Sequence, residues 1–248
     1  MIAVRRADEI EKMRAANRIV GDALRNIEQY IRPGVTTLEL NSIIEDFIFS
    51  AGAVPSFKGY GGFPAASCIS VDEVVVHGIP SLRVLKEGEI VSIDVGTVFR
   101  GYNGDGARTF AVGSISPEKQ RLIDVTRESF FEGLKYIKAG RRLGDYSHAV
   151  QAYVESHGFS VVRAMVGHGI GRAMHEDPEV PNYGRAGSGP MLRAGNCLAL
   201  EPMVNMGGFS VIIDSHDGWT CRAADGNPSA HYENTVVVTD TGAEILTL

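Results

Sequence analysis

The sequence predicts an α/β protein that forms one domain from two similar halves. Its 248 residues are 44% hydrophobic and 22% charged, which is ordinary for a globular protein of this size. Helical patterns occur in two pairs, and each pair is followed by segments with the pattern of β-strands. A short motif also recurs, because YIRPG at 30–34 resembles YIKAG at 136–140. We therefore expect an internal duplication, with halves at about 1–113 and 114–248 and no linker between them.

The first half begins with two helices. Apolar residues at helical spacing predict a helix over 8–30, which the Pro-Gly pair at 33–34 ends. Thr36 and Glu39 form a capping box that predicts a second helix over about 36–51. Strands are then expected at 67–70, 74–77, 90–98 and 108–112.

The second half repeats this order. Ser116 followed by proline is a typical helix start and predicts a helix that runs to about Ala139. A fourth helix is expected at about 145–157, where Gly158 closes it. Strands are expected at 160–166, 196–204, 209–213, 231–239 and 243–247.

Composition excludes several classes of function. A net charge of −6 argues against nucleic acid as a specific partner. No apolar run is long enough to span a membrane, and the N-terminal residues reach charged side chains too soon for a signal peptide. Cys68, Cys197 and Cys221 are too few and too far apart for a disulfide framework. We therefore expect a cytoplasmic protein that binds no membrane.

The segment AMVGHGIGRAMH at 164–175 contains two histidines, His168 and His175. Three glycines leave His168 open on both sides, although glycine costs backbone entropy. The segment is compatible with a tight turn that carries a histidine. A phosphate loop is disfavoured, because the spacing is GxGxG and no helical pattern follows. A functional imidazole at a strand end is the third interpretation.

Four acidic residues lie in or beside expected strands, where such residues are disfavoured. Asp94 and Glu201 are inside apolar segments, Glu233 opens a strand, and Asp105 lies in NGDG beside one. Taken singly, Asp105 is typical of a hairpin turn and Glu233 of a strand edge. A carboxylate inside an apolar strand is harder to explain, because buried carboxylates are rare unless cations or metals pair with them.

These four carboxylates and His168 together predict a metal centre. Oxygen-rich ligation with one imidazole suits two divalent ions that share bridging carboxylates. Such a pair activates a water molecule and stabilises developing negative charge. His231 shares a strand face with Glu233, because only one residue separates them, and no role is assigned to it.

The motifs resemble the type I methionine aminopeptidases over about residues 5–248. They are IDVG at 93–96, NGDGARTF at 103–110, GHGIG at 167–171, LEPM at 200–203 and HYENT at 231–235, with HGIP at 77–80. The resemblance implies a pita-bread fold, in which two pseudo-symmetric halves with antiparallel-rich sheets are covered by helices. It also implies removal of the N-terminal methionine from nascent proteins and peptides that have a small second residue.

The resemblance assigns a role to each expected metal ligand. Asp94 matches the chelating aspartate of one ion, and Asp105 and Glu233 match the bridging carboxylates. His168 and Glu201 match the ligands of the other ion, and Glu201 is also placed as the general base. Two divalent ions of Co, Mn, Fe, Zn or Ni are implied.

The resemblance also implies a substrate pocket. His77 matches the histidine near the nitrogen atoms of the substrate, and His175 matches the one that polarises the scissile carbonyl. The expected pocket residues are Tyr60, Phe63, Cys68, His77, Met174, His175 and Trp219. Two positions depart from many bacterial relatives, because Phe57 replaces a cysteine and Met174 replaces a phenylalanine.

Two other functions share this pattern. Proline-specific aminopeptidases and prolidases have the same five ligands, but HGIP and Trp219 favour the methionine enzyme, and no large additional domain precedes the motifs. A catalytically dead binding module would have broken ligands, whereas all five are intact.

Further expectations follow from the family. They are a monovalent cation near Asp72, Val74 and Ser229, a monomeric state, and nascent chains at the ribosome as partners.

Overall fold

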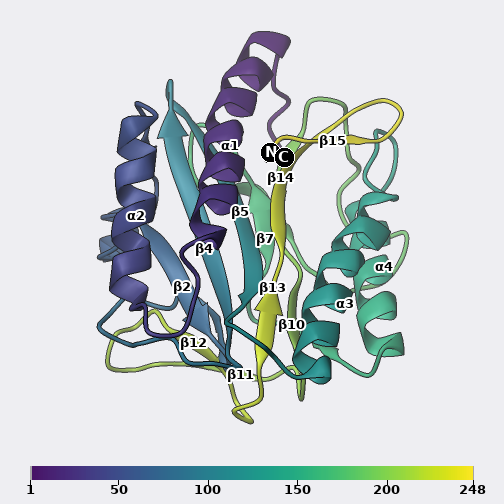
Figure 1. The fold of residues 1–248 in the computed structure, drawn as a ribbon. Helices are drawn as coiled ribbons and strands as arrows, with labels where there is room; N and C mark the ends of the chain where they lie inside the picture. Colours follow the sequence, from purple (N-terminus) through teal and green to yellow (C-terminus); the bar gives the residue numbers. More distant parts are fainter. Residues whose placement is uncertain (1, 248) are drawn as a thin grey trace.

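The computed structural model describes residues 2–247, so Met1 and Leu248, the ends of the expected domain, lie outside the described residues. Its centre is a nine-stranded curled sheet (Figure 1). Every strand pairing in the described chain is antiparallel. The mixed α/β class with antiparallel-rich sheets is therefore confirmed. No helix within 2–247 is long and apolar enough to cross a bilayer.

All four predicted helices are present. They are α1 (Ala7–Glu28), α2 (Thr37–Ser50), α3 (Pro117–Leu134) and α4 (Leu143–Ser156). The capping box of α2 is confirmed, because the Thr36 hydroxyl accepts from Glu39 N and the Glu39 carboxylate accepts from Thr36 N. The Ser116 hydroxyl caps α3 by accepting from Lys119 N, and Pro117 follows it at the first helical position.

The large sheet joins strands from both halves of the chain. Its main path runs β1 (Val54–Pro55), β4 (Ile90–Phe99), β5 (Tyr102–Ala111), β14 (Glu233–Val238), β9 (Cys197–Leu200), β7 (Gly167–Gly169) and β8 (Glu176–Val180). β2 (Ser67–Val71) pairs with β4, and β15 (Ala243–Ile245) pairs with β14. The halves therefore meet where β5 pairs with β14.

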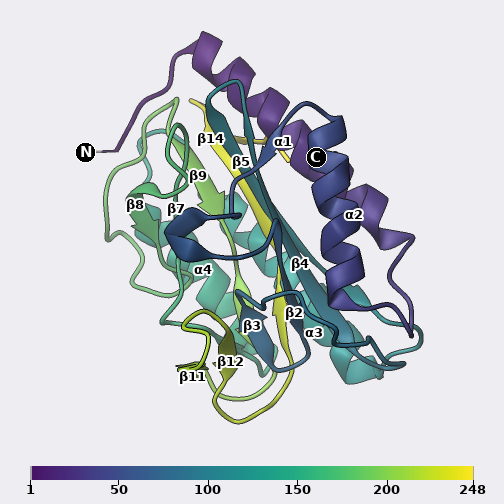
Figure 2. The same ribbon diagram turned by 90° about the vertical axis from the view of Figure 1, so that its left-hand side faces the viewer.

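Two small sheets and one short helix complete the fold. One sheet contains β13 (Ser229–His231), β10 (Met203–Asn205) and β6 (Ser160–Val161), and the other contains β11 (Val211–Ile213), β12 (Cys221–Ala223) and β3 (Val74–Val76). A 3₁₀ turn, η1, spans Tyr60–Gly62. Figure 2 shows β7, β8, β11 and β12 on the side of the molecule away from α1 and α2.

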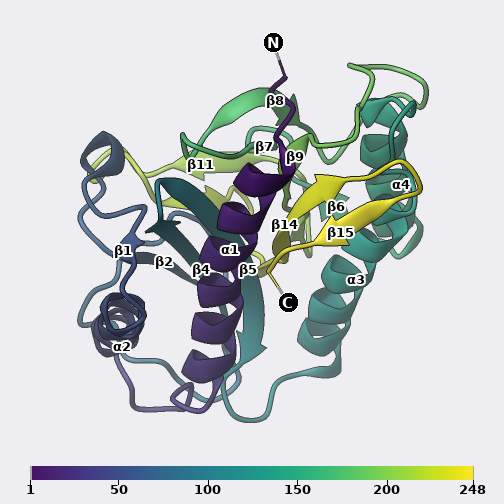
Figure 3. The same cartoon turned by 90° about the horizontal axis from the view of Figure 1, so that it is seen from above.

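Each helix pair covers its own core. The α1–α2 pair packs on β2 and β4, and the α3–α4 pair packs near β9 and β14. Figures 1 and 3 show the two pairs on either side of β14. Each core buries one amphipathic face of its helices, as the apolar spacing in the sequence predicts.

The expected strands at 108–112 and 196–204 were wrong in their bounds. β5 already begins at Tyr102, so the interpretation of Asp105 as a turn residue is wrong. The turn that joins β4 to β5 lies at Arg100 and Gly101, which have φ values of 51° and 79°. The segment expected at 196–204 divides into β9 and β10 around Glu201 and its following proline.

Other strand predictions differ for similar reasons. The segment expected at 160–166 is only β6, and the pairing resumes in β7 at Gly167. The strand expected at 231–239 divides into β13 and β14. β1, β8 and β12 were not predicted, because they are short or lack an apolar pattern.

Candidate metal centre and substrate pocket

The register of the sheet brings three acidic side chains together. Ala107 of β5 pairs with Asp94 on one side and with Glu233 on the other. Side chains two residues apart on a strand point to the same face, so Asp105 lies on the face that carries Ala107. Paired residues also share a face. Asp94, Asp105 and Glu233 therefore converge around a small side chain.

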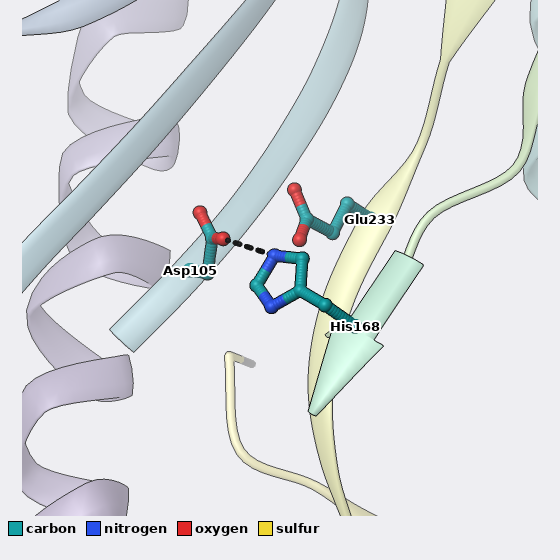
Figure 4. A group of neighbouring side chains, drawn as sticks. All are labelled: Asp105, His168 and Glu233. Atoms are coloured by element: carbon teal, nitrogen blue, oxygen red, sulfur yellow. Dashed lines mark ion pairs between the residues drawn. The ribbon is translucent and has the colours of Figure 1, made fainter. Parts of the chain in front are cut away.

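His168 and Glu201 also reach this group and, like Glu233, they belong to the second half of the chain. His168 Nε2 lies 3.5 Å from Asp105 Oδ2 and 3.7 Å from Glu201 Oε1. Ligand atoms of Asp105, His168 and Glu233 all lie within 4.8 Å of one another. Figure 4 shows the three side chains pointing toward one another from β5, β7 and β14. All five expected ligands line one cavity.

The carboxylate oxygens fit a divalent cation. Asp105 and Glu233 are only 3% and 2% exposed. Asp94 Oδ1, Asp105 Oδ1 and Glu233 Oε1 are buried without a hydrogen-bond partner. Unpartnered buried carboxylate oxygens are costly, and a bound cation removes that cost. The donor set of four carboxylates and one imidazole therefore suits Mn²⁺, Fe²⁺, Co²⁺ or Zn²⁺ better than a soft metal.

The pKa values of the acidic residues in the metal-free centre also favour a cation site. Burial raises the pKa of Asp94 to about 7. Burial, and then repulsion from neighbouring carboxylates, raises the pKa of Asp105, Glu201 and Glu233 well above the usual values. Without a cation, these groups therefore favour the protonated form.

The protonation state and hydrogen bonding of the His168 imidazole suit it to bind a metal ion. Burial lowers its pKa, so the ring is neutral at physiological pH. Its Nδ1 lies 2.9 Å from the Gly169 carbonyl oxygen, which accepts a hydrogen bond from Nδ1–H. The lone pair of Nε2 is then free and faces the carboxylates. The close fit also explains the glycines, because a Cβ at Gly169 would lie 2.0 Å from the Asp177 carbonyl oxygen. Of the three interpretations of this segment, the functional imidazole at a strand agrees with its geometry.

A cavity of about 260 Å³ adjoins the carboxylates. It is lined by every residue expected in the pocket, namely Tyr60, Phe63, Cys68, His77, Met174, His175 and Trp219. The rings of Phe63 and Trp219 pack edge-to-face with centroids 5.2 Å apart. His77 closes the end of β3 with a φ of 60°, a strained value for a residue other than glycine.

His175 lies between the cavity and Tyr60. Its Nδ1 is 2.7 Å from the Tyr60 hydroxyl, and its ring centroid is 4.2 Å from that of His168. Burial, and then repulsion from His168 when both rings are protonated, lowers the pKa of His175 to about 4. When the Tyr60 hydroxyl donates to Nδ1, the proton of the neutral ring is on Nε2. His175 is then a hydrogen-bond donor on its other side.

Sequence reasoning left some residues of the site without a role. His231 is 2% exposed, and its Nε2 lies 3.7 Å from Glu201 Oε2 and 4.0 Å from Glu233 Oε2. Its expected position near Glu233 is therefore confirmed, but the two residues belong to different strands, β13 and β14, so alternation along one strand is not the reason. Apolar wall residues were missed altogether: Val76, Ala164, Met165, Val166 and Met203. They flank the HGIP, GHGIG and LEPM motifs, which is the only signal they give.

Comparison with known proteins agrees with this geometry. Residues 11–240 match the model of metallopeptidase family M24. The methionine aminopeptidase of Clostridium acetobutylicum is 57% identical over 249 residues, which cover 100% of this chain and 99% of the relative. The crystal structure of methionine aminopeptidase from Rickettsia prowazekii matches with a TM-score of 0.99 and 42% identity, and 100% of both chains is covered.

Proline-specific relatives are more distant. Xaa-Pro dipeptidase from Bacillus anthracis matches with a TM-score of 0.80 and 25% identity, covering 98% of this chain but 61% of the other. All five expected ligands line the cavity, and the full-length matches are to methionine aminopeptidases, so both observations favour the same family assignment. The chain belongs to metallopeptidase family M24 and, within it, to the type I methionine aminopeptidases of pita-bread fold.

Proposed function

We propose that the protein removes the N-terminal methionine from nascent proteins and peptides whose second residue is small. The observation that carries the proposal is the position of the cavity, which joins the five clustered ligands to a wall of aromatic and sulfur-containing side chains. A thioether packs favourably against aromatic edges such as those of Phe63 and Trp219. Full-length similarity to methionine aminopeptidases supports the same activity.

The proposed metal ligands are Asp94, Asp105, His168, Glu201 and Glu233. They would hold two divalent ions, and Asp105 and Glu233 are proposed to serve both. A bound cation would satisfy the buried oxygens of these two residues that have no hydrogen-bond partner. Such ions, when bound, polarise a carbonyl and lower the pKa of a water molecule. Co, Mn, Fe, Zn and Ni are the candidate metals.

Three side chains are proposed to act on the substrate. Glu201 would take a proton from the attacking water and pass it to the leaving amine. His175 donates from Nε2 to the carbonyl oxygen, where negative charge develops. His77 contacts the nitrogen atoms of the substrate. The pocket proper consists of Tyr60, Phe63, Cys68, His77, Met174, His175 and Trp219.

Several further properties are proposed from the family resemblance. The chain is proposed to act as one catalytic domain and as a monomer in the cytoplasm, on chains that emerge from the ribosome. A monovalent cation near Asp72, Val74 and Ser229 would be held by main-chain oxygens, because Lys119 already binds the Asp72 carboxylate at 2.7 Å. Potassium-dependent activity after removal of monovalent ions would support it.

The test is peptide hydrolysis after chelation and return of single metals. We expect that the chelated protein is inactive, that one or more of the candidate metals restores cleavage of Met-Ala-Ser, and that Xaa-Pro peptides remain intact. Hydrolysis of Xaa-Pro peptides regardless of Xaa, without cleavage of Met-Ala-Ser, would replace the methionine function with that of a prolidase.

A further inference from the structure

The main chain of Asp105 is held by side chains from two distant elements. β5 pairs with β14 at Ala107 with Glu233 and at Gly106 with Asn234. One residue further, Asp105 N donates to Asn17 Oδ1 at 3.1 Å, and Thr235 Oγ1 donates to the Asp105 carbonyl at 3.0 Å. Asn17 and Thr235 are both fully buried. Beyond the two residue pairs that join β5 to β14, side-chain hydrogen bonds therefore hold the main chain of Asp105.

Close packing of α1 on β5 makes the contact of Asn17 possible. A Cβ at Gly104 would lie 2.8 Å from the main chain of Ala16, so only glycine allows this approach. Thr97 of β4 also donates to the Ala16 carbonyl at 3.0 Å. Asn17 itself is fixed, because its Nδ2 donates to the Met13 carbonyl at 2.9 Å. The amide of Asn17 therefore has a defined orientation toward Asp105.

Glu233 has an equivalent anchor on the other strand. Arg108 Nη1 donates to the Glu233 carbonyl at 2.5 Å, and Nη2 donates to Asn234 Oδ1 at 2.7 Å. The guanidinium also stacks 4.2 Å from the ring of Tyr232. Arg108 thus ties β5 to the first two residues of β14, directly beside the Glu233 side chain.

Asp105 and Glu233 are the two proposed metal ligands whose main chains are held by these side-chain hydrogen bonds. Asp105 and Glu233 are adjacent buried carboxylates, and a ladder of only two residue pairs joins their strands. A small shift of either main chain would move its carboxylate away from the other and from His168. Outer hydrogen bonds that fix ligand orientation commonly determine the affinity of a metal site.

We propose that Asn17, Arg108 and Thr235 are positioning residues, which hold the main chain of Asp105 and Glu233 so that both carboxylates converge on His168 before a metal binds. The inference rests on the proposed metal centre. It identifies side chains that touch neither metal nor substrate as determinants of metal affinity.

The test compares Thr235→Val with Thr235→Ser. Valine keeps the shape and removes the hydroxyl that donates to Asp105, whereas serine keeps the hydroxyl. Thr126→Val is the matched control, because Thr126 is equally buried but donates to Leu122 within α3 at 2.7 Å. Each metal-free protein is titrated with Co²⁺ and followed by visible absorption, and its melting temperature is recorded without metal. Arg108→Lys is measured in parallel.

We expect about tenfold weaker Co²⁺ binding for Thr235→Val and for Arg108→Lys. Thr235→Ser should bind nearly as the native chain does, and Thr126→Val should lower the melting temperature without changing affinity. Native Co²⁺ affinity in both Thr235→Val and Arg108→Lys would overturn the inference and leave the proposed function intact. Equal loss in Thr235→Ser and Thr235→Val would also overturn it. A native chain that binds no Co²⁺ would overturn both.

Discussion

Glu201 and Glu233 have the same side chain but different surroundings. Glu233 opens β14, is 2% exposed, and is surrounded by other carboxylates and by the anchored strand. Glu201 follows β9 and lies 3.7 Å from an imidazole nitrogen of His168 and of His231. It lies in the two-residue break between β9 and β10, and its side chain is 13% exposed. This contrast agrees with a structural ligand at Glu233 and a proton-transferring one at Glu201.

We predict that Glu201→Gln retains metal but loses turnover. The amide oxygen of glutamine can still ligate, whereas the amide cannot take up a proton as a general base. Loss of general acid–base catalysis typically costs ~10²–10⁴ in rate. Metal content by mass spectrometry and kcat on Met-Ala-Ser test this directly. Asp105→Asn is the contrasting variant, which should lose one or both ions, and normal turnover in either variant would contradict the assignment.

We predict that His175→Ala lowers kcat by ~10²–10³ and changes KM much less, as expected for loss of a donor to the developing oxyanion. Tyr60→Phe should lower kcat by a smaller factor, because it removes the hydroxyl 2.7 Å from His175 Nδ1 that fixes the tautomer. Steady-state kinetics on one tripeptide are sufficient. An effect on KM alone would move His175 from catalysis to substrate binding.

At the scale of elements, helices were predicted better than strands for a physical reason. The signals of α2 are local, because Thr36 and Glu39 are three residues apart. β5 is different, since its Asn103-Gly104-Asp105-Gly106 segment has low strand propensity and is held by contacts distant in sequence. Glycine at 104 is required by the approach of α1, so a feature that suggested a turn marks a packing contact.

The loop before η1 determines one side of the cavity through Phe57. A Cβ at Gly96 of β4 would lie 2.6 Å from Phe57 Cε1, so the phenyl ring packs directly on the backbone of β4. Gly96 pairs with Asp105, which places Phe57 beside the proposed metals. Phe57 also lines the cavity. We propose that it limits the size of the second residue of the substrate.

We predict that Phe57→Cys admits larger second residues. Removing the ring opens space, and one methylene in an apolar pocket is worth ~1–3 kcal/mol. The ratio of kcat/KM for Met-Val-Ser to that for Met-Ala-Ser should therefore rise about tenfold. A panel with glycine, alanine, valine and leucine at the second position measures it. An unchanged ratio, with both rates altered equally, would exclude Phe57 as the limiting residue.

Across the whole molecule, the candidate centre lies where the two halves meet. Asp94 and Asp105 come from the first half, and His168, Glu201 and Glu233 come from the second. These residues could be found from sequence, because acids in apolar strands and a histidine between glycines are locally unusual. Asn17, Arg108 and Thr235 could not, because an ordinary polar residue becomes informative only through a partner about a hundred positions away.

The stability of the metal-free protein depends on opposing titrations. The carboxylates have raised pKa values, so their contribution to stability is fully present below about pH 4 and is lost as pH rises through the folded values, about 7 for Asp94. Burial lowers the pKa of His231 to about 3 and that of His175 to about 4. The contribution of these imidazoles is complete above their unfolded value of 6.5 and is lost as pH falls.

We therefore predict that the metal-free protein becomes less stable as pH rises above about 6.5, since the carboxylates still titrate there. The three buried thiols, whose pKa burial raises, add to this trend only near the unfolded value of about 8.5. Divalent metal should reverse this trend, because deprotonated carboxylates bind it more tightly and a ligand that binds only the folded state stabilises it. The measurement is the melting temperature from about pH 6.5 to about 8.5, with chelator and with saturating Mn²⁺. Glu201→Gln is a useful comparison, because removing one titrating carboxylate should flatten the metal-free curve. Two results would show that the carboxylates do not determine the pH dependence of stability. One is a metal-free melting temperature that rises across this range, and the other is a difference between the two curves that does not increase with pH.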